Sequence, residues 1–299
     1  MFASANEIAR LFTFPLVISW RQFNGKCSAT AGALVIINDE GWFVTTYHIL
    51  KYSMNLNQSN QEYQRLMALR SEIENDGSLS KGAREGKLRQ IKIAPEMVTH
   101  HSIWFGGDGL EVGQTLVLPE IDLAVGKINN FRKEMVSAYP KFKDPGKPMP
   151  PGRSLCKLGY PFPVLEPIFH ESKNAFEFQA GSFPPPFFPI DGIFTRRAMV
   201  AEANTPQNPR SYPLAFLETS SPGLRGQSGG PIFDVEGNIW AIQSQTSSYP
   251  LNLESNVNMK PKEREHLENQ FFNVGMGIQS ETIIGFLKEN QIPFELSQS

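Results

Sequence analysis

The sequence has few cysteines, little net charge and no long hydrophobic segment. Its 299 residues include two cysteines, Cys27 and Cys156, which are too few for a disulfide framework. The 28 basic and 30 acidic residues leave a net charge of −2, so nothing attracts the chain generally to nucleic acid or anionic membranes. No stretch approaches the ~20 apolar residues of a membrane span, and the first residues lack the features of a signal peptide. We therefore expect a cytoplasmic protein that binds neither nucleic acid nor membrane.

Proline and glycine, in contrast, are plentiful. The 23 prolines and 24 glycines separate many short runs of β-branched and aromatic residues, a pattern typical of an all-β fold. The expected strands are Leu16–Phe23, Ala31–Ile37, Trp42–Thr46, Thr115–Leu118, Asp122–Lys127, Ser154–Gly159, Leu214–Leu217, Gly230–Phe233, Ile239–Gln243 and Phe271–Ile278.

Three segments depart from this pattern and suggest the domain organisation. Residues 61–91 are polar and charged, with Leu66, Leu69 and Ile73 at helical spacing, which predicts an amphipathic helix, a turn and a second helix. Prolines crowd residues 141–152, which we expect to link an N-terminal domain (1–140) to a C-terminal domain (153–299). The segment from Ser280 begins with a capping residue and an acid, and so predicts a terminal helix.

One glycine-rich motif has the properties of a nucleophile site. Ser228 lies in Gly226-Gln227-Ser228-Gly229-Gly230-Pro231, where small neighbours let a substrate carbonyl approach the backbone. The N–H groups of Gly226 and Ser228 can then point at one spot and form an oxyanion hole. The motif also comes close to the nucleophile elbow of α/β-hydrolases, but no helix pattern follows it directly and the one downstream histidine, His266, lies in a charged run. A glycine-rich turn with an incidental serine is the remaining alternative.

A serine nucleophile needs a base, and the base needs an orienting acid. His48 follows a buried strand pattern, Trp42–Thr46, and Asp122 stands inside an apolar run where an unpaired carboxylate would be costly. Each has a plain alternative, a core histidine and an acid in a turn. The order histidine, aspartate, serine along the chain nevertheless favours a catalytic triad. No histidine has metal-ligand spacing with cysteines or carboxylates, so we expect no metal and no cofactor.

These segments resemble the chymotrypsin-like (trypsin-like) serine protease superfamily, most closely the bacterial trypsin-like peptidases related to the HtrA proteases. The resemblance extends over Gly32–His48, Leu158–Pro161, Ile239–Ser244 and Val274–Ile278. It implies two antiparallel six-stranded β-barrels, with a helical insertion in the first half and a C-terminal helix. His48 and Asp122 would come from the first barrel and Ser228 from the second. Ser244 would support the aspartate.

The resemblance also implies a serine endopeptidase that cleaves peptide bonds in a protein or peptide substrate. Leu224, Arg225, Ser244, Gln245 and Thr246 are expected to bind the substrate, with the region of Gly275 completing the primary specificity pocket. No acid stands at the expected base of that pocket, so a preference for Lys or Arg is not supported; a different fold of the loop could bring in Glu218.

Two questions stay open, the role of the insertion and the function itself. The 61–91 insertion either docks a regulatory partner or gates substrate, or it is a solvated decoration. The function itself has an alternative, a catalytically silent protease-fold protein that acts as a binding partner or scaffold. Gln227 and the bulky Tyr47 depart from the family pattern, and the Gln227 departure gives no support to activation through a new N-terminal amine.

Overall fold

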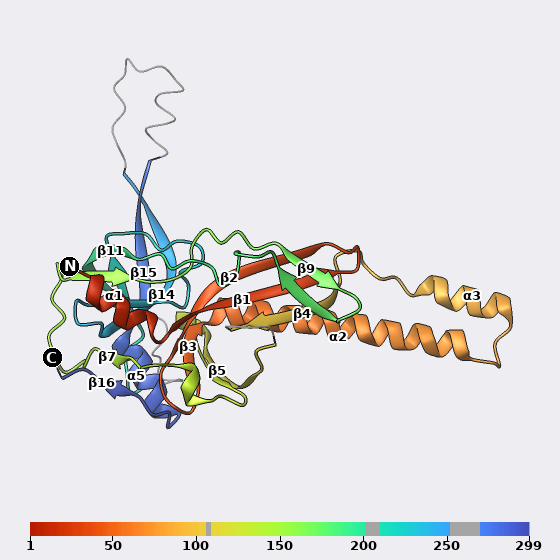
Figure 1. Cartoon of the computed structure of the whole chain (residues 1–299), viewed down its shortest axis with the longest axis horizontal. Coiled ribbons are helices and arrows are strands. Elements are labelled where there is room, and N and C mark those ends of the chain that lie inside the picture. Colours follow the sequence, from red (N-terminus) through yellow and green to blue (C-terminus); the bar gives the residue numbers. More distant parts are fainter. Residues whose placement is uncertain (106–108, 201–209, 252–269, 299) are drawn as a thin grey trace, which may run out of the picture.

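The computed structural model describes residues 1–105, 109–200, 210–251 and 270–298, and most of its elements are strands (Figure 1). They form two large antiparallel sheets, each barrel-like, as in the chymotrypsin-like all-β fold. The predicted fold class is therefore confirmed. Within the described ranges, no helix has the length and apolar character needed to cross a membrane.

The first sheet has the strand order β4-β1-β2-β3-β6-β5. Its strands are β1 (Thr13–Gln22), β2 (Cys27–Ile36), β3 (Trp42–Thr46), β4 (Val98–Trp104), β5 (Val112–Leu118) and β6 (Leu123–Ile128). All five residues of β3 are buried, because this strand runs through the middle of the sheet between β2 and β6. The pairing of Thr46 with Leu123 aligns the end of β3 with the start of β6. His48 lies two residues after β3, and Asp122 lies immediately before β6, so this alignment places both near each other.

The second sheet contains a closed ring of six strands. They are β8 (Ser154–Lys157), β11 (Ile190–Met199), β12 (Ala215–Thr219), β13 (Pro231–Phe233), β14 (Ile239–Pro250) and β15 (Phe271–Gln279), and β13 pairs with β14 to close the ring. Two short strands, β7 (Lys141–Phe142) and β16 (Glu295–Leu296), extend the sheet from β14 in parallel. The proline-rich segment thus begins as part of the second sheet. The division into domains at 141–152 stays a prediction.

A hairpin from the second half of the chain covers part of the first sheet. It consists of β9 (Pro167–His170) and β10 (Ala175–Phe178). Phe176 forms a buried apolar cluster with Val17 and Trp104 of the first sheet, and Phe169 packs against that cluster. The two halves therefore share apolar surface away from the ends of β3 and β6. Sequence patterns did not predict this hairpin or β11, because exposed residues alternate irregularly along them.

Four longer helices accompany the sheets in the described ranges: α1 (Ala3–Arg10), α2 (Tyr47–Asn75), α3 (Lys81–Gln90) and α5 (Ser280–Glu289). Single 3-10 turns occur at η1 (Pro119–Ile121) and η2 (Lys133–Met135). The expected terminal helix is α5, which buries Ile283, Ile284 and Leu287. Both chain ends lie at one end of the molecule, and α2 and α3 project from the other (Figure 1).

The helical insertion begins earlier than the sequence predicted. Helix α2 starts at Tyr47 rather than near residue 61, so His48 lies in the first turn of a helix and not at the end of a strand. Its buried residues, Ile49, Leu50, Ser53 and Leu56, follow helical spacing, but their pattern continues directly from the apolar run of β3. At about 1.5 Å per residue, the 29 residues of α2 span about 43 Å. We call the part formed by residues 61–91 the arm.

The arm is expected to be dispensable for folding. No residue from 61 to 91 is buried, and α2 is fixed to β4 before the arm begins, where Ser59 accepts a hydrogen bond from the Val98 amide. Replacing residues 61–91 by a short Gly/Ser linker should change the free energy of unfolding by less than about 1 kcal/mol, as for other surface changes. Urea denaturation measures this quantity. Leu56→Ala, which empties a buried position at the base of α2, is the contrasting control and should cost about 2–5 kcal/mol. An arm replacement as costly as Leu56→Ala would contradict the prediction.

Candidate active site

Asp122 occupies the turn between η1 and β6. Its φ of 60° is left-handed, a conformation that aspartate tolerates better than most side chains. The Asp122 amide donates to the Pro119 carbonyl at 3.1 Å, which closes the 3-10 turn. Because β6 begins at the next residue and pairs with β3, Asp122 lies beside the first residues of α2. The sequence predicted an aspartate within a strand, but the structure places it immediately before one.

Asp122 provides the N-terminal cap of α2 from a distant part of the chain. The first amides of a helix have no partner within the helix. Here the Tyr47 amide donates to the Asp122 carbonyl at 2.8 Å, and the His48 amide donates to Asp122 Oδ1 at 2.8 Å. The carboxylate thus lies at the positive end of the helix dipole, which favours its charged form. This capping role was missed, because nothing in the sequence connects residue 122 to a helix start at residue 47.

The second carboxylate oxygen orients the His48 ring. His48 Nδ1 lies 2.8 Å from Asp122 Oδ2, and Ser244 Oγ donates to the same oxygen at 2.6 Å. A charged carboxylate only accepts hydrogen bonds, so Nδ1 carries the hydrogen and Nε2 is left with a lone pair. Burial alone would raise the pKa of Asp122, but the hydrogen bonds from His48 and Ser244 outweigh it, and the pKa lies below its ordinary value. Asp122 is therefore charged at neutral pH.

Ser228 lies on the loop before β13, and both sheets fix this loop. The Ala33 amide of β2 donates to the Ser228 carbonyl at 2.7 Å, and the Gly229 amide donates to the Gln243 carbonyl of β14 at 2.8 Å. Gly229 has φ +85°, and a Cβ there would collide with the Ala33 carbonyl oxygen. Glycine is required at this position, since both the backbone conformation and the close approach exclude a side chain.

Ser228 and His48 line the same cavity, but the Ser228 hydroxyl is turned to a different acceptor. The cavity has a volume of about 300 Å³, and its wall includes Ile49, Tyr52 and Arg225. Ser228 Oγ donates to the Ser244 carbonyl at 3.1 Å, and no hydrogen bond joins these two described residues, Ser228 and His48. Contacts of this kind are often loose in the absence of substrate. The hydroxyl and the imidazole thus border one space without being bonded.

The predicted oxyanion hole has a glycine with an unusual backbone. Gly226 lines the cavity and has φ +100°, and a Cβ on it would meet the Tyr160 carbonyl. The amides of Gly226 and Ser228 donate to no backbone oxygen in the described ranges. The buried Gln227 between them braces the loop: its Oε1 accepts from the Leu224 amide at 3.0 Å, and its Nε2 donates to the Phe188 carbonyl at 3.3 Å. Gln227 was noted only as a departure from the family pattern, and its amide holds two loops together.

Of the five residues expected to bind substrate, only one lines this cavity. Arg225 lines the cavity, whereas Ser244 is occupied with Asp122. Thr246 Oγ1 donates to the Gly223 carbonyl at 2.6 Å and so ties β14 to the loop before Ser228. Leu224 and Gln245 do not line the cavity. Their backbones bond to buried glutamines instead: the Leu224 amide donates to Gln227, and the Gln245 carbonyl accepts from Gln243. The sequence missed the opposite wall, which consists of Ile18, Trp20, Thr30 and Ala31 from β1 and β2.

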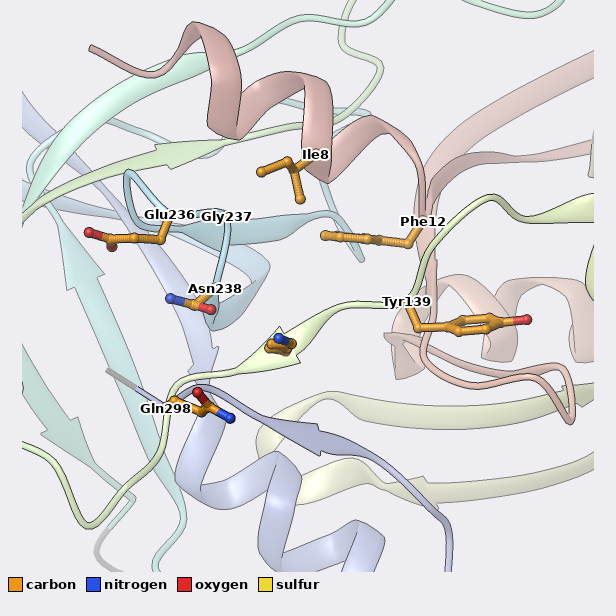
Figure 2. Close-up of a pocket in the computed structure, with 8 residues that line it drawn as sticks. Ile8, Phe12, Tyr139, Glu236, Gly237, Asn238 and Gln298 are labelled. Carbon is orange, nitrogen blue, oxygen red and sulfur yellow. The ribbon is translucent and has the colours of Figure 1, made fainter.

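A larger cavity, of about 510 Å³, contains none of the predicted site residues. It lies between α1 and the loop at residues 236–238, with Ile8 and Phe12 on one side and Gln298 on the other (Figure 2). Of its lining residues, Glu236 and Lys141 are charged, and none is a serine, cysteine or histidine. The smaller cavity beside Ser228 is therefore the better candidate for chemistry.

The electrostatics of Asp122 predict a measurable acid sensitivity. Since the folded chain holds the pKa of Asp122 below 3.8, its ordinary value, the stability that this carboxylate contributes is complete above pH 3.8. That stability is lost as the pH falls through the lowered folded-state pKa. The free energy of unfolding should therefore fall more steeply below pH 3.8 in the wild type than in Asp122→Asn, which cannot titrate there. Urea denaturation at stepped pH measures both curves, and parallel curves would contradict the assigned hydrogen bonds.

Comparison with known proteins gives structural similarity only. No protein-family profile matches the chain, and no curated protein matches it. Among solved structures, two of the HtrA-type protease AlgW with a tripeptide have TM-scores of 0.47 at 14% identity, and they cover 97% of this chain. The chain spans 63% of the length of those AlgW chains. The active form of the Rv3671c protease from M. tuberculosis has a TM-score of 0.48 at 11% identity, over 98% of this chain and 86% of that one.

Proposed function

We propose that the chain is a serine endopeptidase in which Asp122, His48 and Ser228 form the catalytic triad. The observation that carries this proposal is the hydrogen bond of 2.8 Å between His48 Nδ1 and Asp122, with Ser228 on the same cavity. It gives the imidazole the tautomer that a general base needs, with the Nε2 lone pair free. The chemistry of the remaining groups agrees with this role.

The reaction begins when Ser228 Oγ rotates from the Ser244 carbonyl towards His48 and loses its proton to Nε2. The oxygen attacks the carbonyl carbon of the peptide bond, and the amides of Gly226 and Ser228 hold the negative oxygen of the tetrahedral intermediate. His48 then donates the proton to the leaving amine. Water hydrolyses the acyl-enzyme by the same steps, while Asp122 stays charged and stabilises the imidazolium.

One observation favours the alternative, a catalytically silent protein that binds peptides with the same site. The Ser228 hydroxyl donates to the Ser244 carbonyl instead of His48. A nucleophile that never leaves that carbonyl would not react. Reactivity of Ser228 therefore distinguishes the two functions.

A fluorophosphonate probe should label the protein at Ser228, as found by mass spectrometry of the peptide that contains residue 228. Ser228→Ala should lose the label and lower kcat for peptide hydrolysis by about 10⁶-fold, as for a triad serine elsewhere. Ser220→Ala, a change in another serine of the second sheet region, is the matched control and should label normally. An unlabelled wild type, or a Ser228→Ala variant that still cleaves peptides, would refute the triad.

We propose further that the arm acts on large substrates or on a regulatory partner. His48 belongs to the first turn of α2, and Ile49 and Tyr52 of the same helix line the cavity. The arm therefore continues, without a break in the helix, from the wall of the candidate active site. A protein that binds the arm thus contacts the same helix, α2, that carries the proposed base His48.

The linker replacement of residues 61–91 tests this role. The variant should react with the fluorophosphonate at the wild-type rate, because His48 and the buried turns of α2 remain. Cleavage of a folded protein substrate should change at least about tenfold more than cleavage of a small peptide ester, a difference of about 1.4 kcal/mol between the two barriers. Equal rates on both substrates would mean that the arm is a decoration.

A further inference from the structure

A buried lysine lies behind the loop that leads to Ser228. Lys157, the last residue of β8, is 1% exposed, and its Nζ donates to the carbonyls of Ser221 and Pro222 at 2.5 and 2.9 Å. No acidic side chain among the described residues forms an ion pair with it. Two neutral carbonyls compensate a buried charge only in part. Lys157 is thus a buried amine without an acidic partner inside the second sheet.

The Lys157 amine lies where three segments meet. The loop from Ser221 runs towards Ser228, and the Gly275 amide of β15 donates to the Ser221 carbonyl at 2.8 Å. A Cβ on Gly275 would lie 2.5 Å from Lys157 Nζ, which is too close. The amine therefore lies directly against the backbone of β15. On the other side, Thr246 of β14 bonds to Gly223 of the same loop. These are the three segments that the sequence analysis expected around the primary specificity pocket.

The acidic groups near Lys157 do not neutralise its ammonium. Glu218 on β12 is also buried, but Thr195, Arg196 and Tyr249 already donate to its carboxylate. Cys156, next to Lys157, stays neutral because burial raises its thiol pKa to about 11. Asp191 on β11 is opposite Cys156 in the register and is exposed.

The walls near the amine are polar as well. Gln243 is only 1% exposed, and its Nε2 donates to the carbonyls of Gln245 and Met276. Its Oε1 and the Ser221 hydroxyl are buried without a hydrogen-bond partner. A Cβ on Gly223 would collide with the Gln243 amide, so this amide lies directly against the loop. The Ser221 hydroxyl can donate to a carboxylate, whereas an aliphatic or aromatic side chain would leave it unpaired, which is costly. Gln243 Oε1 is an acceptor and gains no partner from a carboxylate.

We propose that Lys157 makes the site selective for a carboxylate side chain, aspartate or glutamate, immediately before the bond to be cleaved. The inference rests on the proposed function and specifies its substrate class. In this structure the Gly275 amide bonds to the Ser221 carbonyl and Thr246 bonds to Gly223, so the loop from Ser221 must move away from β15 before a substrate carboxylate reaches Lys157. The carboxylate then accepts a hydrogen bond from the Lys157 ammonium, away from water. The same positive charge repels lysine and arginine at this position.

The charge of Lys157 also makes the selectivity depend on pH. Burial lowers the pKa of Lys157 to about 7, so the amine is charged below that pH and neutral well above it. A bound carboxylate favours the charged form and moves the pKa upwards. The preference for an acidic side chain is therefore strongest in mildly acidic solution and weakens as the pH rises.

The experiment compares two peptide substrates that differ only by glutamate or glutamine before the cleaved bond. In the wild type at pH 6, kcat/KM should be at least about tenfold higher for the glutamate peptide, as for a hydrogen bond between charged groups. The ratio should fall towards one as the pH rises to 9. Lys157→Met should abolish the glutamate preference at every pH while Ser228 still reacts with the fluorophosphonate. Lys143→Met, a change in another buried lysine, which directly follows β7, is the matched control and should keep the preference.

The outcomes separate this inference from the proposed function. A wild type that reacts at Ser228 and cleaves both peptides equally would overturn the role of Lys157 and leave the protease intact. If Ser228 does not react, the protease proposal fails. The inference about Lys157 is then tested by calorimetry, which measures the affinities of peptides that end in glutamate or in glutamine. Tighter binding of the glutamate peptide at pH 6, lost at pH 9, supports it, and equal binding refutes it. These wild-type readouts remain decisive where Lys157→Met does not fold.

Discussion

The candidate site depends on the carboxylate of Asp122 and the atoms around it. Four hydrogen bonds end on this one residue: from the amides of Tyr47 and His48, from the His48 ring and from the Ser244 hydroxyl. They come from the start of α2 and from β14, while Asp122 itself precedes β6. A helix of the first half and a strand of the second half are thereby positioned relative to one carboxyl group. Asp122 has a left-handed backbone, which aspartate tolerates, and these partners surround it.

The Ser228 loop has the corresponding constraint. Its position comes from main-chain hydrogen bonds to β2 and β14, which leave no room for side chains at Gly229, and from the Gln227 amide. Neither the loop nor the imidazole depends on a disulfide, and both cysteines are free thiols. Rigidity at this site is thus obtained from backbone hydrogen bonds between the sheets, which are short and directional.

Part of this arrangement could be predicted from the sequence because it follows from local patterns. The all-β class follows from the short runs between glycines and prolines, and the strand Trp42–Thr46 was predicted with the bounds of β3. The start of α2 was not, because its first buried turn continues the apolar run of β3, so the change of periodicity is hidden. Nor could Lys157 be recognised, since a lysine at a strand end normally lies in water. Its burial depends on the loop from Ser221, which is distant in sequence.

The roles of His48, Asp122 and Ser228 stay predictions, although the chain brings two of them into contact and the third to the same cavity. The direction of the Ser228 hydroxyl could not have been predicted, because a rotation about one bond decides between the Ser244 carbonyl and the imidazole. The hydrogen bonds by which Gln227 braces the loop could not have been predicted either. Such details depend on contacts between loops, for which a sequence pattern contains no signal.

The bond from Ser244 to Asp122 joins residues 122 positions apart, which bears on when the site forms during synthesis. A ribosome must release β14 before that bond can exist. β13, which follows the serine loop, pairs with β8 as well, but the ring closes only when β14 pairs with β13. The earlier product, which ends before the serine loop, contains His48 and Asp122 but not Ser228. Under the proposed function, the nascent chain is therefore inert, and its own unfolded segments are not exposed to a finished site while they emerge.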